Sequence, residues 1–148
     1  MKLKKYINLI NMSQDCIFCK IVSGQIPTYT LFEDEKVIVF LDAYPVSFGH
    51  SLFVPKKHYE TIDKVPEEDI DFLKKLPYIV KQIKKITNAI GINIWQNNGR
   101  EAGQIVPHVH FHIVPRYPND SLFDFPSQKQ LNENEAKNIV KKFNQNKI

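Results

Sequence analysis

The chain has 148 residues, of which 43% are hydrophobic and 24% are charged, and its formal net charge is +4 at pH 7. These values are ordinary for a soluble globular protein with one domain and one core. No run approaches the ~20 apolar residues that a membrane-spanning helix needs, so the sequence predicts no membrane association.

Part of the positive charge falls on one predicted helix, which carries Lys74, Lys75, Lys81, Lys84 and Lys85. A nucleic-acid-binding face would combine clustered Lys and Arg with exposed aromatic residues, and no such stripe is visible. We therefore expect solvated helix faces and no nucleic-acid partner. The modest positive field would favour an anionic small substrate.

The N-terminal segment starts with basic residues, but its apolar part is short and is interrupted by Asn8 and Asn11. No small-residue cleavage site follows, so a signal peptide is not expected. We predict a disordered leader over residues 1–14 and a single domain over residues 15–148, with a helical tail at its C-terminal end. The missing signal and the two cysteines favour a cytoplasmic protein.

A short helix is predicted over residues 17–23, capped by Asp15 and closed by Gly24. Cys16 and Cys19 would then lie on one side of its first turn. Their spacing indicates metal or redox chemistry rather than a secreted disulfide framework. The alternative is two reduced cysteines that pack as small hydrophobic side chains.

Three strands are expected next, at residues 29–33, 37–41 and 51–54. The continuous apolar run at 37–41 favours a central strand. A loop from Asp42 to Gly49 separates the second strand from the third.

A long helix is predicted to begin at Pro66 and to end at Gly91, because apolar residues recur between them at helical spacing. Pro77 falls inside this pattern and is expected to kink or split the helix. A fourth strand is expected at 92–96. With one long helix among strands joined mainly by turns, the fold class is α+β with a largely antiparallel sheet.

Residues 108–113 alternate histidine with an apolar residue, which is the period of a β-strand. His108, His110 and His112 would therefore share one face of a fifth strand, while the apolar residues face a core. Pro115 is expected to end this strand. Near the C-terminus, a polar helix with a thin apolar stripe is predicted, carrying Leu131, Ile139 and Phe143.

A row of imidazoles suits phosphoryl or nucleotidyl transfer, because neutral imidazole is nucleophilic near pH 7 and its neighbours can hydrogen-bond phosphoryl oxygens. The same row would also suit a catalytic zinc ion. Surface histidines on an edge strand are the third alternative, which strict alternation disfavours. The remaining histidines, His50 and His58, are expected to belong to the same site.

Three sequence blocks carry a resemblance to a known family: CIFCKIVSGQIP, FLDAYPVSFGHSLFVPKKH and NNGREAGQIVPHVHFHIVPR. In this order they resemble the histidine-triad (HIT) family, in its bacterial-type, Hint-like branch with an N-terminal Cys-x-x-Cys. The resemblance spans roughly residues 16–117. It implies a five-stranded, mainly antiparallel sheet with one long helix and short terminal helices. It also implies a homodimer with a continuous ten-stranded sheet, and a purine nucleotide bound beside the triad.

The resemblance assigns the catalytic roles to four histidines. His110 would attack the α-phosphorus and form a nucleotidyl-histidine intermediate that water cleaves. His112 would hydrogen-bond the α-phosphate oxygens, His50 would line the same pocket, and His108 would lie beside the nucleophile.

The resemblance also assigns substrate contacts. Asp42 would accept the ribose hydroxyls, with capping of its own loop as the less favoured alternative, and Asn97 and Gln104 would contact the phosphate and leaving group. The family usually carries Ser or Thr after that glutamine, where this chain has Ile105, and this departure points to slow turnover or a different substrate.

A metal site is implied at Cys16, Cys19, His58 and His108. Four such ligands close a tetrahedral zinc site, so the zinc would be structural and the chemistry would need no metal.

The expected function is hydrolysis or nucleotidyl transfer at a nucleoside 5′-phosphoryl group, similar to that of an adenosine 5′-phosphoramidase. Three alternatives stay open. They are a dinucleoside polyphosphate hydrolase of the same family, a nucleotide- or partner-binding module with weak activity, and a zinc hydrolase that uses His108, His110 and His112 as ligands.

Overall fold

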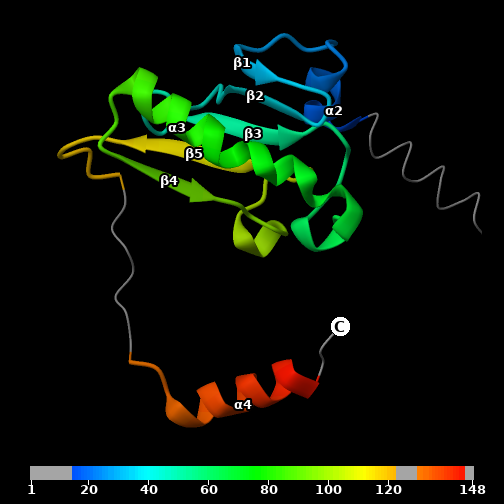
Figure 1. Ribbon diagram of the computed structural model, residues 1–148, viewed down its shortest axis with the longest axis vertical. Helices are drawn as coiled ribbons and strands as arrows, with labels where there is room; N and C mark the ends of the chain where they lie inside the picture. Colours follow the sequence, from blue (N-terminus) through cyan, green and yellow to red (C-terminus); the bar gives the residue numbers. More distant parts are fainter. Residues whose placement is uncertain (1–14, 123–129, 146–148) are drawn as a thin grey trace, which may run out of the picture.

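The computed structural model describes residues 15–122 and 130–145. One antiparallel sheet with strand order β1-β2-β3-β5-β4 forms its centre (Figure 1). The strands are β1 (Thr30–Glu33), β2 (Val37–Leu41), β3 (Ser51–Pro55), β4 (Gly91–Trp95) and β5 (Phe111–Arg116). The predicted α+β class and the number of strands are confirmed. The predicted leader at residues 1–14 lies outside the described residues.

The sheet separates two layers of apolar side chains, because residues along each strand alternate between its faces. Val37 and Val39 of β2 join the larger core, which lies under the long helix α3 (Leu76–Thr87). Ile38 and Phe40 point to the other face, where the short helix α2 (Ile17–Val22) packs. The continuous apolar run predicted a central strand, and all but one of its residues are buried.

The first helix begins differently from the prediction, whereas the expected break in the long helix is confirmed. The residue at the N-cap position of α2 is Cys16 rather than Asp15, and its side chain makes no capping hydrogen bond. The predicted long helix is split, as Pro77 allowed, into a 3₁₀ segment at Glu67–Lys75 and α3. Pro77 lies in the first turn of α3, where a missing N–H costs no helical hydrogen bond.

The histidine strand also begins and ends later than predicted. β5 starts at Phe111, so His108 and His110 precede it, and Pro115 lies inside it. β3 pairs only with residues 111–113 of β5. Beyond them that side of β5 has no partner strand among residues 15–122 and 130–145, so the missing N–H of Pro115 removes no bond to β3.

The C-terminal helix α4 (Glu133–Gln145) begins after Leu131, which was predicted to belong to its apolar stripe, and none of its residues is buried. Asn132 caps it, because its Oδ1 accepts the backbone N–H groups of Asn134 and Glu135 at 2.9 and 3.0 Å. Within the described residues, no helix has both the length and the apolar character needed to cross a bilayer.

Gly49 connects the loop after β2 to the start of β3 at a point of close approach. Its φ is +83°, and a Cβ at this position would lie 2.5 Å from Thr87 Cγ2 of α3 and 3.3 Å from Pro115 Cγ of β5. Both the backbone conformation and the available space therefore require glycine here. This close contact places the following residue, His50, at the end of the sheet.

We expect Gly49→Ala to lower the free energy of unfolding by about 2–4 kcal/mol, the sum of a left-handed backbone penalty and an overlap with α3. Chemical denaturation measures it. Gly24→Ala is the matched control, because Gly24 also has a positive φ, of +77°, but has no atom within 4 Å of the added Cβ. It should lose only about 1–2 kcal/mol, and equal losses in the two variants would contradict the argument.

Candidate functional site

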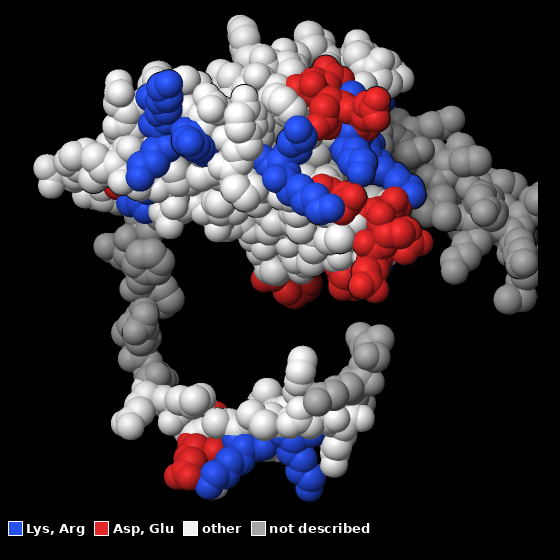
Figure 2. Space-filling model, viewed as in Figure 1, with Lys and Arg blue, Asp and Glu red and all other residues white. Residues whose placement is uncertain are grey.

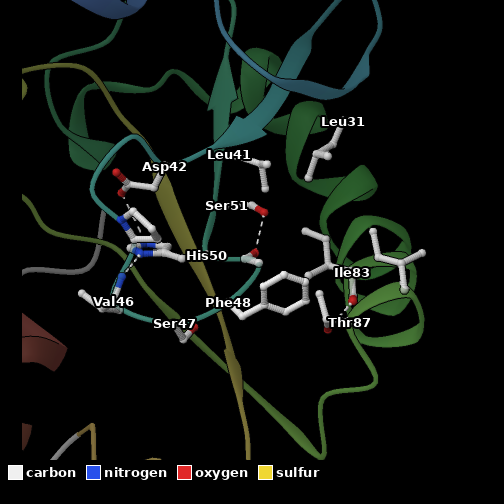
Figure 3. A pocket seen from close by; sticks show the side chains of 13 residues that line it. Leu31, Leu41, Asp42, Val46, Ser47, Phe48, His50, Ser51, Ile83 and Thr87 are labelled. Atoms are coloured by element: carbon white, nitrogen blue, oxygen red, sulfur yellow. Dashed lines mark hydrogen bonds and ion pairs between the residues drawn. The ribbon is translucent and has the colours of Figure 1, made fainter.

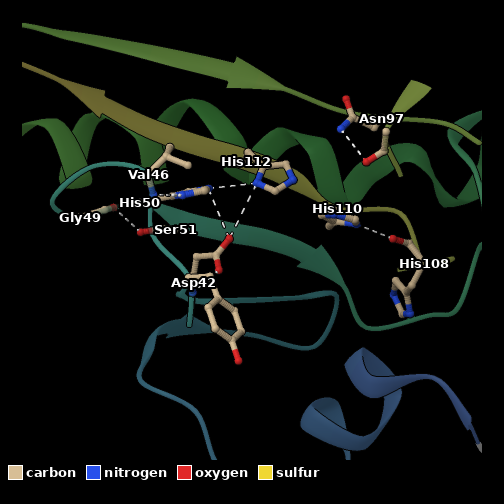
Figure 4. Close-up of polar contacts among 11 residues, drawn as sticks. Asp42, Val46, Gly49, His50, Ser51, Asn97, His108, His110 and His112 are labelled. Carbon is tan, nitrogen blue, oxygen red and sulfur yellow. Dashed lines mark hydrogen bonds and ion pairs between the residues drawn. The ribbon is translucent and has the colours of Figure 1, made fainter. Parts of the chain in front are cut away.

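Three imidazoles meet on the α2 face of the sheet, at the junction of β3 and β5 (Figure 4). His50 Nε2 lies 2.9 Å from His112 Nδ1, and the ring centroids of His110 and His112 are 5.0 Å apart. His50 and His110 are only 2% and 5% exposed. The rings of Phe18, from α2, and His110 pack in a T-shaped arrangement, with centroids 5.0 Å apart.

Backbone groups determine which nitrogen of each ring carries the proton. The N–H of Val46 donates to His50 Nδ1 at 3.1 Å, so neutral His50 has its proton on Nε2. That Nε2–H is directed at His112 Nδ1, which therefore accepts it. His112 is left with its own proton on Nε2, as a hydrogen-bond donor toward the open side of the site.

The opposite tautomer holds for His110. Its Nδ1–H donates to the backbone carbonyl of His108 at 2.7 Å, so the lone pair lies on Nε2. The site thus places a nucleophilic nitrogen on His110 beside an N–H donor on His112. This pairing is suited to attack on a phosphoryl or acyl centre whose oxygens need a hydrogen-bond donor.

Asp42, at the end of β2, completes this group. Its Oδ2 lies 3.5 Å from His50 Nε2 and 4.0 Å from His112 Nδ1, while Oδ1 accepts the N–H of Tyr44 at 2.8 Å. Burial lowers the pKa of His50, and the negative charge of Asp42 offsets part of that effect. Asp42 therefore both holds its own loop and compensates buried imidazoles.

Burial keeps the imidazoles of His110 and His112 neutral at pH 7. It is the largest cause of the lowered pKa of His110. Burial, followed by the proximity of His110 and His50, lowers the pKa of His112 to about 4. A neutral His110 keeps its Nε2 lone pair available for attack.

Stability should fall as the solution is acidified, because the unfolded chain binds a proton at His112 near pH 6.5 while the folded chain resists it down to about pH 4. The loss is confined to that window and amounts to about 3 kcal/mol for this residue alone. Denaturation curves between pH 7 and pH 4 measure it. In His112→Gln the slope of unfolding free energy against pH should flatten by nearly one proton. An unchanged slope would contradict the assignment.

The loop between β4 and the triad is tied by its own side chains. Asn97 Nδ2 donates to the Gly103 carbonyl at 3.3 Å. Gln104 Oε1 accepts the N–H of Gly99 at 2.7 Å, and its Nε2 donates to the Glu60 carbonyl at 2.7 Å. Figure 4 shows the Asn97 amide with its hydrogen bond inside the loop, and the amide of Gln104 is likewise engaged by backbone groups.

Ile105, which follows Gln104, is 92% exposed. Its side chain carries no proton donor.

A second cluster lies beside the triad and contains the two cysteines. Four ligand atoms lie within 4.8 Å of one another: Cys16 Sγ, Cys19 Sγ, His58 Nδ1 and His108 Nδ1. The measured separations between thiol and imidazole atoms run from 3.3 to 3.6 Å, and the two nitrogens are 3.1 Å apart. Zn–S and Zn–N bonds of about 2.3 and 2.0 Å in a tetrahedron imply about 3.3–3.8 Å between ligand atoms, so the residues fit zinc once the two nitrogens separate by a few tenths of an ångström.

The chemistry of the donors also fits a cation. The Nε2–H of His108 donates to the Pro55 carbonyl at 2.8 Å, which leaves the Nδ1 lone pair directed at the cysteines. Burial raises the pKa of Cys16, but the contacts of its sulfur with the imidazoles of His108 and His58 outweigh burial and lower that pKa to about 5. Burial and the nearby Cys16 raise the pKa of Cys19 to about 12.

A metal shared by the three triad histidines is inconsistent with this geometry. Both ring nitrogens of His108 are directed elsewhere, one at the cysteines and the other at the Pro55 carbonyl. Asp42, His50 and His112 also lie within 4.8 Å of one another. Metal binding through His50 Nε2 would, however, place a proton on Nδ1, against the N–H of Val46. The five histidines therefore divide into two groups. His50, His110 and His112 contact one another, whereas His58 and His108 lie with the two cysteines as possible metal ligands.

Sequence analysis missed the backbone groups that set these tautomers, namely the Val46 N–H and the carbonyls of Pro55 and His108. Every residue carries such groups, so no signal in the sequence could have marked them.

Comparison with known proteins matches residues 23–119 to the HIT domain. A HIT-like protein of Methanocaldococcus jannaschii is 46% identical over 128 residues, which cover 85% of this chain and 98% of that protein. A protein of Schizosaccharomyces pombe named adenosine 5′-monophosphoramidase is 45% identical over 108 residues, covering 71% of this chain and 76% of that protein.

The solved structures agree with the observed fold. A crystal structure of a HIT family member from Bacillus subtilis superposes with a TM-score of 0.84 at 35% sequence identity. The superposition covers 90% of this chain and 98% of that one. The described triad and sheet therefore lie in the region that these proteins share.

Proposed function

Because the chain belongs to the HIT domain family, we propose that it is a purine nucleotide hydrolase acting at a nucleoside 5′-phosphoryl group, with adenosine 5′-phosphoramidates as substrates. The observation that carries this proposal is the pair of opposite tautomers, with a lone pair on His110 Nε2 beside an N–H on His112 Nε2. The name of the S. pombe relative supports the substrate class.

The reaction proceeds in two displacements. His110 Nε2 attacks the α-phosphorus, so that an N–P bond forms while the bond from phosphorus to the leaving amine breaks. The amine leaves with a proton from solvent, because Ile105 offers none. Water then attacks the phosphorus of the nucleotidyl-histidine, which releases the nucleoside monophosphate and restores neutral His110.

The neighbouring residues bind and orient. His112 donates from Nε2 to a phosphoryl oxygen and stabilises the charge that develops there, while His50 holds His112 in this tautomer. Asp42 accepts the ribose hydroxyls. Asn97 faces the phosphate and leaving group, and Gln104 positions its loop through the Glu60 and Gly99 backbone.

Cys16, Cys19, His58 and His108 would hold zinc in this proposal. When bound, the ion supplies a cross-link between α2 and the start of the triad rather than a reactive group. Phe18 of α2 and the His108 carbonyl both touch His110, so this cross-link steadies the nucleophile from two sides.

We also propose a homodimer. β4 is an edge strand, since β5 is its only partner within the described residues. Ile90 and Ile94, beside it and within it, are 65% and 45% exposed. Antiparallel pairing of two β4 strands would cover this edge and produce a ten-stranded sheet. A monomeric mass in sedimentation velocity would contradict the dimer.

A panel of leaving groups tests the proposed function. We expect kcat/KM for adenosine 5′-phosphoramidate to exceed that for diadenosine polyphosphates by at least about tenfold, with adenosine monophosphate as product. The reverse preference would establish the dinucleoside polyphosphate hydrolase instead. Stoichiometric nucleotide binding without turnover of any substrate would establish a binding module.

A further inference from the structure

An apolar pocket of about 660 Å³ lies between α3 and the Asp42–Gly49 loop (Figure 3). Its apolar walls are Leu31, Leu41, Val46, Phe48, Ile83 and Ile86. Phe48 and Ile86 are 76% and 63% exposed, which is unusual for neighbouring large apolar side chains. Asp42 and His50 also line the pocket, so the pocket and the imidazole site share the loop between β2 and β3.

Helix α4 carries an apolar stripe that is left exposed within the part of the chain that the structure describes. Ala136, Ile139, Val140 and Phe143 recur at the i, i+3, i+4, i+7 spacing of one helix face. The last three are 64%, 59% and 75% exposed. Figure 2 shows the charged side chains of α4 gathered on one side, with uncharged residues on the other. A helix of 13 residues is only marginally stable in water without a packing partner.

The segment that leads from the sheet to α4 begins at the pocket. The hydroxyl of Tyr117 donates to the backbone carbonyl of Phe48 at 2.7 Å, and the two rings are 6.4 Å apart. Arg116 holds the next turn through two hydrogen bonds to Asp120, at 2.8 and 2.6 Å. The chain therefore leaves the body of the protein beside a residue that lines the pocket.

The chain is long enough for α4 to return to this place. The stretch from Leu122 to Glu133 can extend over roughly 36 Å. A short tether gives its two ends an effective local concentration on the order of millimolar, so a weak apolar contact within one chain can form. The stripe of α4 spans about 10 Å, a length comparable with a pocket of this size.

We propose that α4 docks its apolar stripe into the pocket between α3 and the Asp42–Gly49 loop of the same chain. The docked helix covers Phe48 and Ile86 and removes both apolar surfaces from water. It also packs against the loop that carries Asp42 and His50, both of which line the pocket. This inference rests on the two surfaces and the tether, and it does not depend on the proposed activity.

Amide hydrogen exchange of the full-length chain tests the docking. We expect the α4 amides, together with those of residues 46–50, to exchange at least about tenfold more slowly in the parent than in Ile139→Asp/Phe143→Asp. These substitutions lie on a helix with no buried residue, so the folded sheet should survive them. Asn134→Asp/Asn138→Asp adds the same charge on the polar face and should retain the protection.

The pocket side supplies the reciprocal test. Ile86→Asp should speed amide exchange in α4 as much as Ile139→Asp/Phe143→Asp does. Combining the substitutions should speed exchange little further, because each variant removes the same contact. Protection should persist on an approximately hundredfold dilution, since docking is intramolecular. Exchange of α4 amides at unprotected rates in the parent would overturn the proposal. Protection that disappears on dilution would also overturn it, because docking onto a second copy would then be indicated.

Discussion

Replacing His110 with alanine should lower kcat/KM for adenosine 5′-phosphoramidate by about 10⁴-fold or more, while the dissociation constant for adenosine monophosphate changes little. The substitution removes the only atom to which phosphorus would become bonded, Nε2 of His110, whereas the ribose and phosphate contacts come from other residues. Steady-state kinetics and calorimetric nucleotide binding measure the two effects separately.

A matched substitution separates covalent catalysis from charge stabilisation. His112→Gln keeps an N–H donor near the phosphoryl oxygen and should lose only about 10²-fold. Acid quenching of the parent during turnover should trap labelled nucleotide on the protein, and the His110→Ala protein should trap none. Retained turnover in that variant, or labelling of another residue, would contradict the role of His110.

The second large effect concerns the cysteine cluster. The double substitution Cys16→Ser/Cys19→Ser should remove about one zinc ion per chain and lower the free energy of unfolding by more than about 5 kcal/mol, because structural zinc contributes its binding energy to folding. For a chain of this size that corresponds to a fall in Tm of roughly 15 °C or more. Metal analysis and thermal unfolding are the measurements.

A chelator provides the control for this prediction. It should lower the Tm of the parent toward that of the double variant and leave the variant unchanged. Hydrolysis measured well below the reduced Tm should largely survive the loss of zinc, because no reacting atom touches the metal ligands except through the His108 carbonyl. A parent that purifies without metal, and whose Tm the chelator leaves unchanged, would contradict the zinc site.

The two predictions concern neighbouring side chains, the imidazole of His110 and the cysteine cluster that includes His108. His108 and His110 are two residues apart, yet one ring is directed at the cysteines and the other at the open side of the triad. The backbone carbonyl of His108 joins them. Loss of zinc is therefore expected to act on His110 only indirectly, through the position of this carbonyl, and to leave the lone pair on His110 Nε2 available.

Local patterns in the sequence predicted most of the elements. Alternation in residues 108–113 indicated a strand, the apolar run at 37–41 indicated a central one, and Pro77 indicated a break in the long helix. Strand formation, strand burial and a helix break each depend on the backbone geometry and polarity of a few consecutive residues, so a local pattern is sufficient to predict them. The predicted end of β5 at Pro115 and the predicted cap of α2 at Asp15 were wrong. Both depend on contacts with distant parts of the chain, which a local pattern does not contain.

The sequence by itself determined the element types, the histidine row and the family resemblance with the residues it singles out. Only the tertiary structure decided how the five histidines divide, which nitrogen of each carries its proton, and that an apolar pocket lies where the tail begins. Those features depend on contacts between distant segments, such as Cys16 with His108 across 92 residues, and on backbone groups that every residue possesses. Local periodicity contains no information about either, because both arise only when the sheet is assembled.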